Sequence, residues 1–218
     1  MKTIKLSSLL AFLFFALASC DQSAPEVKDS EEKEEKPSSL DGSYMVNTEK
    51  STLKWKGSML EVGGVSLYSH HGDIKIAKGE INAKEGRLSS GSVIVDMTTI
   101  NPQDDGYKDE DGRRAEDLVG HLSSDDFFNV EEHPTARLNI TGMADGKVSG
   151  KMTIRGNEKD IAIEEVEMKE SEDGMMHAKG KFSFDRQEFG AKFKIPAQDK
   201  VLSDRVRMEF EIYAEKSN

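Results

Sequence analysis

The stretch that decides the fold reads VRMEFEIYA over residues 206–214. Apolar side chains occupy every second position, namely Val206, Met208, Phe210, Ile212 and Ala214, and polar or charged side chains occupy the positions between them. Successive side chains of a β-strand point to opposite faces of the sheet, so a period of two predicts a strand that is buried on one face and solvated on the other.

The same alternation recurs along the chain and predicts an all-β fold. Shorter examples lie at residues 53–55, 74–76, 93–97, 138–140, 152–154 and 182–184. Turn signals at residues 61–64, 84–86, 144–147 and 172–174 contain Gly, often after Asp, and supply the positive φ that hairpins require. We expect an extended antiparallel sheet of about eight strands. Closure into a barrel removes exposed sheet edges, so the barrel is favoured over two stacked sheets.

One long segment interrupts the period. Residues 107–131 are charged and irregular, and residues 113–122 within them predict a short helix. Ser124, Asp125 and Asp126 are residue types that begin helices, and they precede Phe127 and Phe128. Connections this long usually have a function or carry small helices of their own. We expect a crossing loop that covers one end of the barrel.

The N-terminus predicts an exported lipoprotein. Lys2 and Lys5 precede a mainly apolar run over residues 6–17, which is too short for a spanning helix of ~20 residues and suits a signal-peptide core of about 7–15. Residues 17–20, LASC, resemble the lipobox, in which the cysteine receives a diacylglyceryl group before cleavage. Residues 1–19 are thus a predicted signal peptide and Cys20 the lipidated residue. Alternatively, Cys20 is an incidental cysteine after an ordinary signal.

The segment after Cys20 predicts a tether. Residues 21–41 contain eight acidic residues, three lysines and two prolines, and they carry too few apolar side chains to form a core. We interpret residues 20–41 as the lipidated cysteine with a disordered acidic tether, and residues 42–216 as one domain. This organisation predicts a bacterial envelope protein that fatty acyl chains, palmitate among them, hold to a membrane. The domain then faces the periplasm or the cell surface.

Charge and motifs argue against several other classes of function. The net charge of −11 provides no basic footprint for nucleic acid. The histidines at positions 70, 71, 121, 133 and 177 form no HExxH pattern, and no second cysteine accompanies Cys20, so neither a metal nor a cofactor is predicted. No Gly-x-Ser-x-Gly elbow is present, and Asp125 with Asp126 suits a helix cap as well as an acid/base pair. We predict no catalytic residue and keep a lipid-directed hydrolase as an alternative.

Several short motifs together resemble the YceI-like family. They are GHL at residues 120–122, SDDFF at 124–128, His133-Pro134 and the strand at 136–140, with further similarity at 51–56, 71–72, 93–100, 150–156, 159, 184–186 and 189–190. They occur in one order across residues 44–214. The resemblance implies an extended, lipocalin-like antiparallel β-barrel that holds a long polyisoprenoid or similar lipid. Many members are soluble periplasmic proteins, so the lipobox and the acidic tether depart from the family pattern.

The alternation and the resemblance together select candidate ligand-binding residues. These are Trp55, Phe127, Phe128, Leu138, Ile154, Arg155, Phe182, Phe184 and Phe210. Arg155 is expected to hold an anionic lipid head; the alternative is a strand end with Arg155 exposed or paired to Asp185. The apolar members either line a ligand site or fill the core, and periodicity cannot separate these two roles.

The favoured function is therefore storage, transport or sequestration of an isoprenoid-like lipid. The alternative is an envelope interaction protein with a filled barrel. Neither the exact lipid nor the oligomeric state follows from the sequence.

Overall fold

A computed structural model describes residues 40–61, 66–109, 113–195 and 200–217. The predicted signal peptide and Cys20 lie outside these residues. So do nearly all of the acidic segment and most of the turn at 61–64. Within the described ranges, no helix has the length and apolar character needed to cross a membrane.

The described elements form one antiparallel sheet with a single α-helix. In chain order they are β1 (Gly42–Val46), β2 (Thr52–Glu61), β3 (Ser66–Lys84), β4 (Arg87–Pro102), α1 (Ala115–Ser123), β5 (Thr135–Ala144), β6 (Lys147–Ile154), β7 (Asn157–Ile163), β8 (Glu167–Glu170), β9 (Met176–Asp185), the 3₁₀ helix η1 (Arg186–Phe189), β10 (Lys200–Leu202) and β11 (Arg205–Lys216). All seven alternating segments of the sequence lie in strands. The all-β antiparallel class is therefore confirmed.

The number of strands exceeds the expected eight, because three short strands share positions in the sheet with longer ones or extend its edge. β2 and β1 both lie between β3 and β11, β2 pairing with the first part of β3 and β1 with its last part. β10 continues the position of β11 along β2, and β8 adds a short edge beside β9. Counted without the short edge strand β8, eight positions across the sheet remain, which agrees with the expected number of about eight strands.

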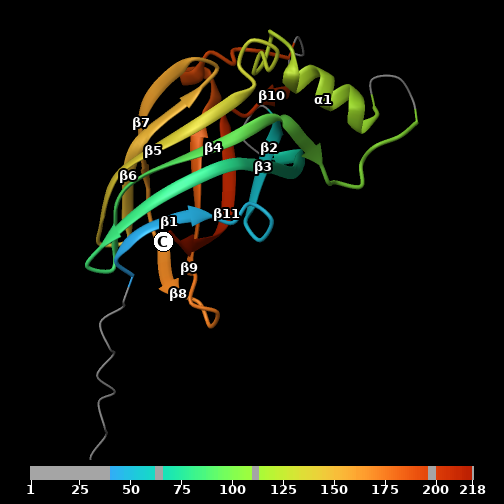
Figure 1. Cartoon of the computed structure of the whole chain (residues 1–218). Helices are drawn as coiled ribbons and strands as arrows, with labels where there is room; N and C mark the ends of the chain where they lie inside the picture. Colours follow the sequence, from blue (N-terminus) through green and yellow to red (C-terminus); the bar gives the residue numbers. More distant parts are fainter. Residues whose placement is uncertain (1–39, 62–65, 110–112, 196–199, 218) are drawn as a thin grey trace, which may run out of the picture. The chain divides into compact units, whose positions relative to one another are not determined.

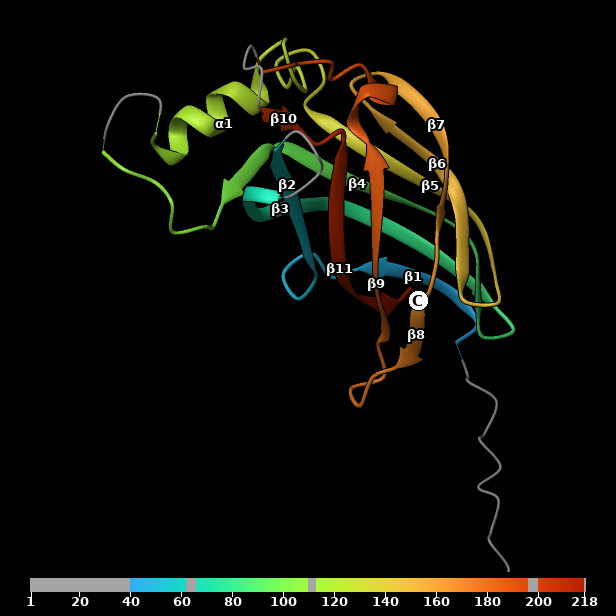
Figure 2. The same ribbon diagram turned by 180° about the vertical axis from the view of Figure 1, so that it is seen from behind.

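The sheet curls strongly around its inner face. Figures 1 and 2 show β3 to β7 sweeping over one side of the domain, with β9 and β11 on the other side. No ladder of hydrogen bonds joins β7 to β9 over their described lengths. At one end of this seam the chain crosses from β7 to β8, where Val166 is buried and donates its N–H to the carbonyl of Gly146 at 2.7 Å. The barrel form is present, but backbone hydrogen bonds do not close it at this seam.

The hairpin turns follow the predicted chemistry. Glu85 and Gly86 connect β3 with β4, and Asp145 and Gly146 connect β5 with β6, each residue with a φ between 50° and 72°. An additional hairpin turn lies between β6 and β7, where Arg155 and Gly156 have φ values of 51° and 69°. Residues 150–156, GKMTIRG, therefore form the end of a strand and a tight turn.

A glycine allows a close approach between β3 and the end of β4. Gly72 pairs with Trp55 on β2 and with Pro102 on β4. A Cβ atom at Gly72 would lie 2.1 Å from the carbonyl oxygen of Asn101 and 2.8 Å from the Trp55 ring, so no larger residue fits without a backbone shift. The Trp55 indole N–H donates to the carbonyl of Asp73 at 3.2 Å.

The long connection carries the expected helix but not the expected cap. α1 spans Ala115–Ser123, close to the predicted 113–122. The prediction that residues 124–126 form an N-cap before Phe127 and Phe128 is wrong, because turns follow Ser124. The backbone N–H and the hydroxyl of Ser124 reach the carbonyl of His121 at 3.2 and 2.8 Å, so Ser124 closes α1 instead. The following turns place Phe127 and Phe128 in the core.

The core consists of two clusters at opposite ends of the curled sheet. One surrounds Tyr44 and Met176 near β1 and β8, and it includes Leu40, which is only 2% exposed although it falls within the expected tether. The other surrounds Phe127 and Phe189 near α1. The interior between these clusters is where the candidate site lies.

Candidate functional site

An apolar cavity of about 350 Å³ lies inside the curled sheet and is bordered by both core clusters. Its wall is formed mainly by aliphatic and aromatic side chains, including Ile76, Val95, Ile140, Met152 and Ile212. Protein interiors are close-packed and contain few voids larger than a water molecule. The strands therefore enclose more space than their own side chains fill.

Eight of the nine predicted site residues line this cavity. They are Trp55 from β2, Phe127 and Phe128 from the loop after α1, Leu138 from β5, Ile154 from β6, Phe182 and Phe184 from β9, and Phe210 from β11. The strand residues meet because the apolar positions of each alternating strand face the concave side. The loop residues meet them because the turns after α1 fold back over the end of the barrel.

The expectation that Arg155 holds an anionic head is contradicted by its surroundings, since it is not among the residues that line the cavity. Its guanidinium donates to the carbonyls of Phe127 at 3.1 Å, Gly190 at 2.5 Å and Asp125 at 2.6 Å. The alternative pairing with Asp185 is not what its contacts show either. Arg155 instead ties the Phe127 loop to the segment after η1.

Arg186 stabilises the same region, around Phe127 and the segment after η1, from inside the protein. Its side chain is 2% exposed and donates to the carbonyls of Ala191 and Ser203 and to the carboxylate of Asp204 at 2.9 Å. Burial lowers the pKa of Arg186, while Asp204 and Asp185 act in the opposite direction, and a guanidinium remains charged at neutral pH. Its central carbon lies 5.4 Å from the centroid of the Phe127 ring. The two arginines hold this end of the cavity in shape.

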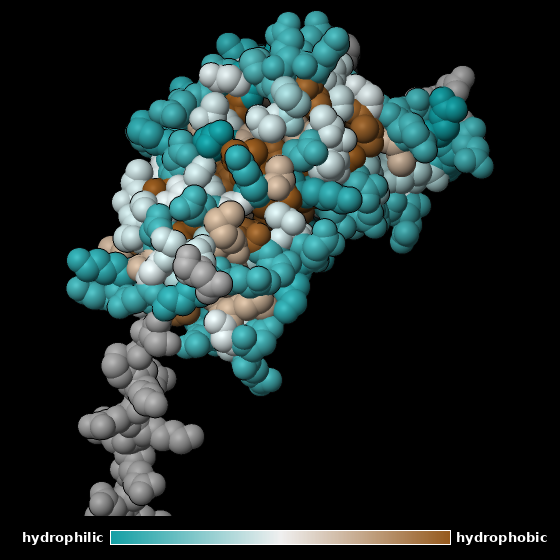
Figure 3. Space-filling model, in the orientation of Figure 1, coloured by the Kyte–Doolittle hydropathy of each residue, from teal (hydrophilic) through white to brown (hydrophobic). Residues whose placement is uncertain are grey.

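The cavity reaches the surface at the end that carries α1. Tyr68 lines the cavity and is also 50% exposed. His121 and Phe193 line the same region, with ring centroids 4.4 Å apart in an edge-to-face arrangement. Figure 3 shows hydrophobic residues at the surface beside α1, and further ones over the middle of the same face. We refer to this region, with Tyr68, His70 and His121, as the mouth.

The sequence reasoning missed one polar group at the mouth. His70 lines the cavity, and its Nδ1 lies 2.9 Å from Asp104 Oδ2. Tyr107 donates its hydroxyl to Asp104 Oδ1 at 3.0 Å, and the backbone N–H of His71 donates to the same oxygen at 3.1 Å. No local motif signals this group, because Asp104 and Tyr107 lie in the loop after β4, far from His70 in sequence.

The charge of Asp104 follows from these hydrogen bonds. Burial raises the pKa of Asp104, but the hydrogen bonds from His70, the His71 backbone and Tyr107 outweigh it and lower the pKa overall. Burial, with the neighbouring carboxylate of Asp104, raises the pKa of Tyr107 above its ordinary value. Asp104 is therefore ionised at neutral pH and Tyr107 is protonated. In the described part of the chain, no three His, Cys, Asp or Glu side chains are arranged to hold a metal ion.

Comparisons with known proteins agree with this architecture. A family model described as "YceI-like domain" matches residues 44–214. The crystal structure of Burkholderia cenocepacia BcnA is 16% identical with a TM-score of 0.58, and the alignment covers 78% of this chain and 99% of that one. A polyisoprenoid binding domain from Saccharophagus degradans, implicated in plant cell wall breakdown, is 12% identical with a TM-score of 0.53, covering 80% and 98%. At these identities the two structures show a shared fold. No curated protein matches the chain in sequence.

Proposed function

Because this chain belongs to the YceI-like domain family, we propose that it binds an isoprenoid-like lipid inside the curled sheet. The main support for this proposal is the apolar cavity of about 350 Å³ with its mouth beside α1. Ligand sites commonly have volumes of ~300–1,000 Å³ and mainly apolar walls. The Saccharophagus degradans domain, described as polyisoprenoid-binding, supports the same ligand class.

The wall chemistry suits a hydrocarbon chain. Aliphatic and aromatic side chains of Leu138, Ile154 and Phe182 offer dispersion contacts and no hydrogen-bonding groups. Burying apolar surface yields roughly 25 cal/mol per Å², so a long prenyl chain gains affinity along its whole length. A filled barrel that acts only through its loops would leave this cavity without a role.

We also propose that Cys20 anchors the protein to a membrane of the cell envelope. Lipid attachment there would keep the domain near the source of its ligand, and the acidic segment would set its reach. Each buried methylene of an acyl chain contributes ~0.8 kcal/mol, so two or more chains anchor far better than one. The role would then be storage, transport or sequestration of the lipid in the envelope.

Native mass spectrometry of the full-length protein tests the binding proposal. Protein purified from membranes in mild detergent should carry a co-purifying apolar lipid, which organic extraction should release in a prenyl-containing fraction. Chelators should leave occupancy unchanged, since the proposal involves no metal. Protein that carries no lipid, and that takes up no added prenyl alcohol after extraction, would overturn the proposal.

A further inference from the structure

The mouth of the cavity contains a polar group that an apolar wall alone does not need. His70 lines the cavity from β3, and Asp104 and Tyr107 support it from the loop after β4. The side chains of His70 and Asp104 are 34% and 11% exposed, so their hydrogen bond is partly shielded from solvent. Charge-assisted hydrogen bonds of this kind hold a side chain in one orientation.

The hydrogen bonds select one tautomer of His70. The carboxylate of Asp104 accepts from Nδ1 at 2.9 Å, and the Tyr107 oxygen lies 3.2 Å from the same nitrogen. Because an ionised carboxylate only accepts hydrogen bonds, Nδ1 must carry the proton. In neutral imidazole the other nitrogen, Nε2, is then a hydrogen-bond acceptor.

Two aromatic rings hold the imidazole of His70 in place. Tyr107 stacks on the imidazole with a centroid distance of 5.6 Å and an interplanar angle of 16°. Tyr68 packs edge-to-face against it at 5.7 Å. Among the hydrogen bonds of the described residues, none ends on Nε2 of His70. The ring is thus fixed in orientation, and Nε2 has no hydrogen-bond partner among the described residues of a chain whose cavity His70 lines.

We propose that Nε2 of His70 accepts a hydrogen bond from the hydroxyl end of a prenyl-chain lipid whose hydrocarbon part lies in the cavity. This inference rests on the proposed lipid binding and narrows its ligand to an alcohol or a phenol. A phosphate ester is disfavoured, because its negative charge would approach the carboxylate of Asp104, and like charges repel in a poorly solvated site.

A second histidine provides a matched control. His177 on β9 lies 2.9 Å from Glu211 through Nε2 and stacks on Tyr213 with a centroid distance of 4.5 Å. It therefore has the same kind of carboxylate and tyrosine partners as His70, but it does not line the cavity. Replacing it tests the effect of losing such a histidine without touching the mouth.

The experiment measures prenyl ligands on extracted full-length protein. Trp55 is the single tryptophan of the chain and lines the cavity, so its fluorescence reports occupancy directly. The probes are geranylgeraniol, the hydrocarbon with the same carbon skeleton but no hydroxyl, and geranylgeranyl diphosphate. They are titrated into wild type, His70→Phe, Asp104→Asn and His177→Phe, after thermal melting has shown which variants are folded.

The readout is the ratio of alcohol affinity to hydrocarbon affinity within each protein. This ratio should fall roughly 3- to 10-fold in His70→Phe, the effect expected for one neutral hydrogen bond, and should stay unchanged in His177→Phe. Asp104→Asn keeps the shape of the side chain but removes the carboxylate that fixes the proton on Nδ1 of His70. Its affinity ratio should therefore lie between those of wild type and His70→Phe. This variant replaces His70→Phe in the experiment if His70→Phe does not fold. The diphosphate should bind wild type no more tightly than the alcohol.

The outcomes separate the two proposals. If wild type binds the probes but the ratio is the same in His70→Phe and Asp104→Asn, or if the diphosphate binds most tightly, the head-group inference is overturned and lipid binding stands. If none of the three probes changes Trp55 fluorescence or appears in native mass spectra of wild type, lipid binding itself is overturned.

Discussion

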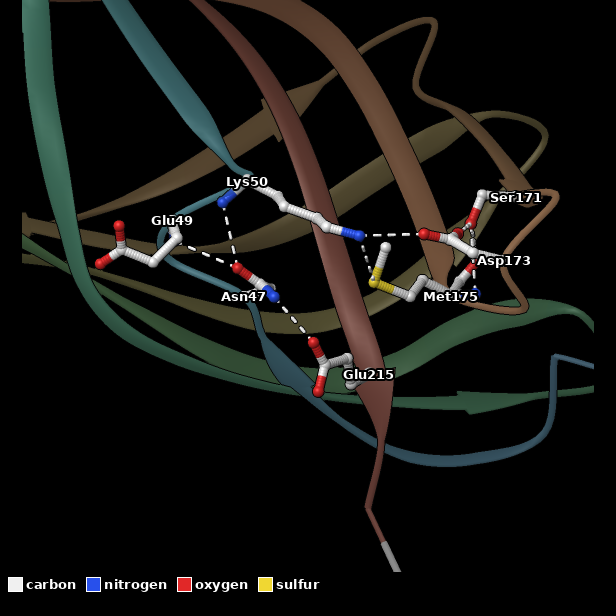
Figure 4. Close-up of polar contacts among 7 residues, drawn as sticks. All are labelled: Asn47, Glu49, Lys50, Ser171, Asp173, Met175 and Glu215. Carbon is white, nitrogen blue, oxygen red and sulfur yellow. Dashed lines mark hydrogen bonds and ion pairs between the residues drawn. The ribbon is translucent and has the colours of Figure 1, made fainter.

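Lys50 Nζ lies 2.9 Å from Asp173 Oδ2 and joins the turn before β2 to the turn between β8 and β9 (Figure 4). Asn47 supports the same corner: its side-chain oxygen accepts from the backbone N–H of Lys50 at 3.0 Å, and its amide donates to Glu215 at 2.7 Å. This polar corner lies on the side of the barrel away from α1, so it joins strand ends without involving the cavity mouth (Figure 1).

The Lys50–Asp173 contact predicts a pH dependence of stability. Hydrogen bonds from Ser171 and Lys50 lower the pKa of Asp173 from its ordinary 3.8 to about 2. A carboxyl with a depressed pKa contributes stability above its unfolded-state pKa and loses it as pH falls through the folded-state pKa. The advantage of wild type over Asp173→Asn in urea unfolding should therefore shrink between about pH 4 and pH 2. Both partners are about half exposed, so the effect is small. An advantage that persists undiminished at pH 2 would contradict this assignment.

Gly72→Ala should destabilise the fold by roughly 1–3 kcal/mol, because the added methyl collides with the carbonyl of Asn101 and must displace backbone. Gly57→Ala, on the adjacent strand β2, is the control: a Cβ there meets nothing within 4 Å. Its effect should stay within about 0.5 kcal/mol. Denaturant unfolding of the two variants measures both values, and equal effects would show that the close approach at Gly72 is not required.

Arg186→Met should destabilise the protein by on the order of 3 kcal/mol, since it removes the donor to the buried carbonyl of Ala191 and to the partly buried carbonyl of Ser203. Arg207→Met removes the same charge from an exposed position on β11 and should have little effect. Thermal unfolding compares the two. The Phe127 loop should also become more accessible to proteolysis in Arg186→Met, and an unchanged cleavage pattern would argue against its role in holding the cavity end.

Ile154→Trp should lower lipid occupancy while the domain still folds, because the larger side chain extends into cavity volume that the ligand would use. In a filled core the same change would overpack and cost roughly 1–3 kcal/mol or more. Val201→Trp places an equal ring on an exposed position outside the cavity wall and serves as the control. Native mass spectrometry and melting temperature together decide between the two cases. Unfolding of Ile154→Trp with full occupancy in Val201→Trp would indicate tight packing at this site.

Cys20→Ala should abolish lipidation, since the chain has no other cysteine to accept the diacylglyceryl group. The variant should appear in the soluble envelope fraction, whereas wild type should sediment with membranes. Cells grown with a radioactive fatty acid provide the measurement. Label that persists in the variant protein would show that the lipobox assignment is wrong.

The local features of this protein could be predicted from its sequence. A period of two is a property of neighbouring residues, so the strands around Trp55, Leu138 and Phe210 are visible without knowledge of their partners. The same holds for Asp145-Gly146 and the other hairpin turns, whose backbone angles depend on the turn residues themselves. Short strands such as β1, β8 and β10 were not predicted, because a few residues are too few to show an alternating pattern.

Only the tertiary structure decided what the arginines and His70 do. Arg155 appeared suited to an anion, but the fold brings three carbonyls to its guanidinium from segments about thirty residues away. His70 gained its carboxylate partner in the same way, across 34 positions. The cavity likewise could not be inferred from alternation, because the enclosed volume depends on how strongly the whole sheet curls. Sequence determines which side chains face inward, whereas the number of atoms that meet there is set by strand register and curvature, which no single strand contains.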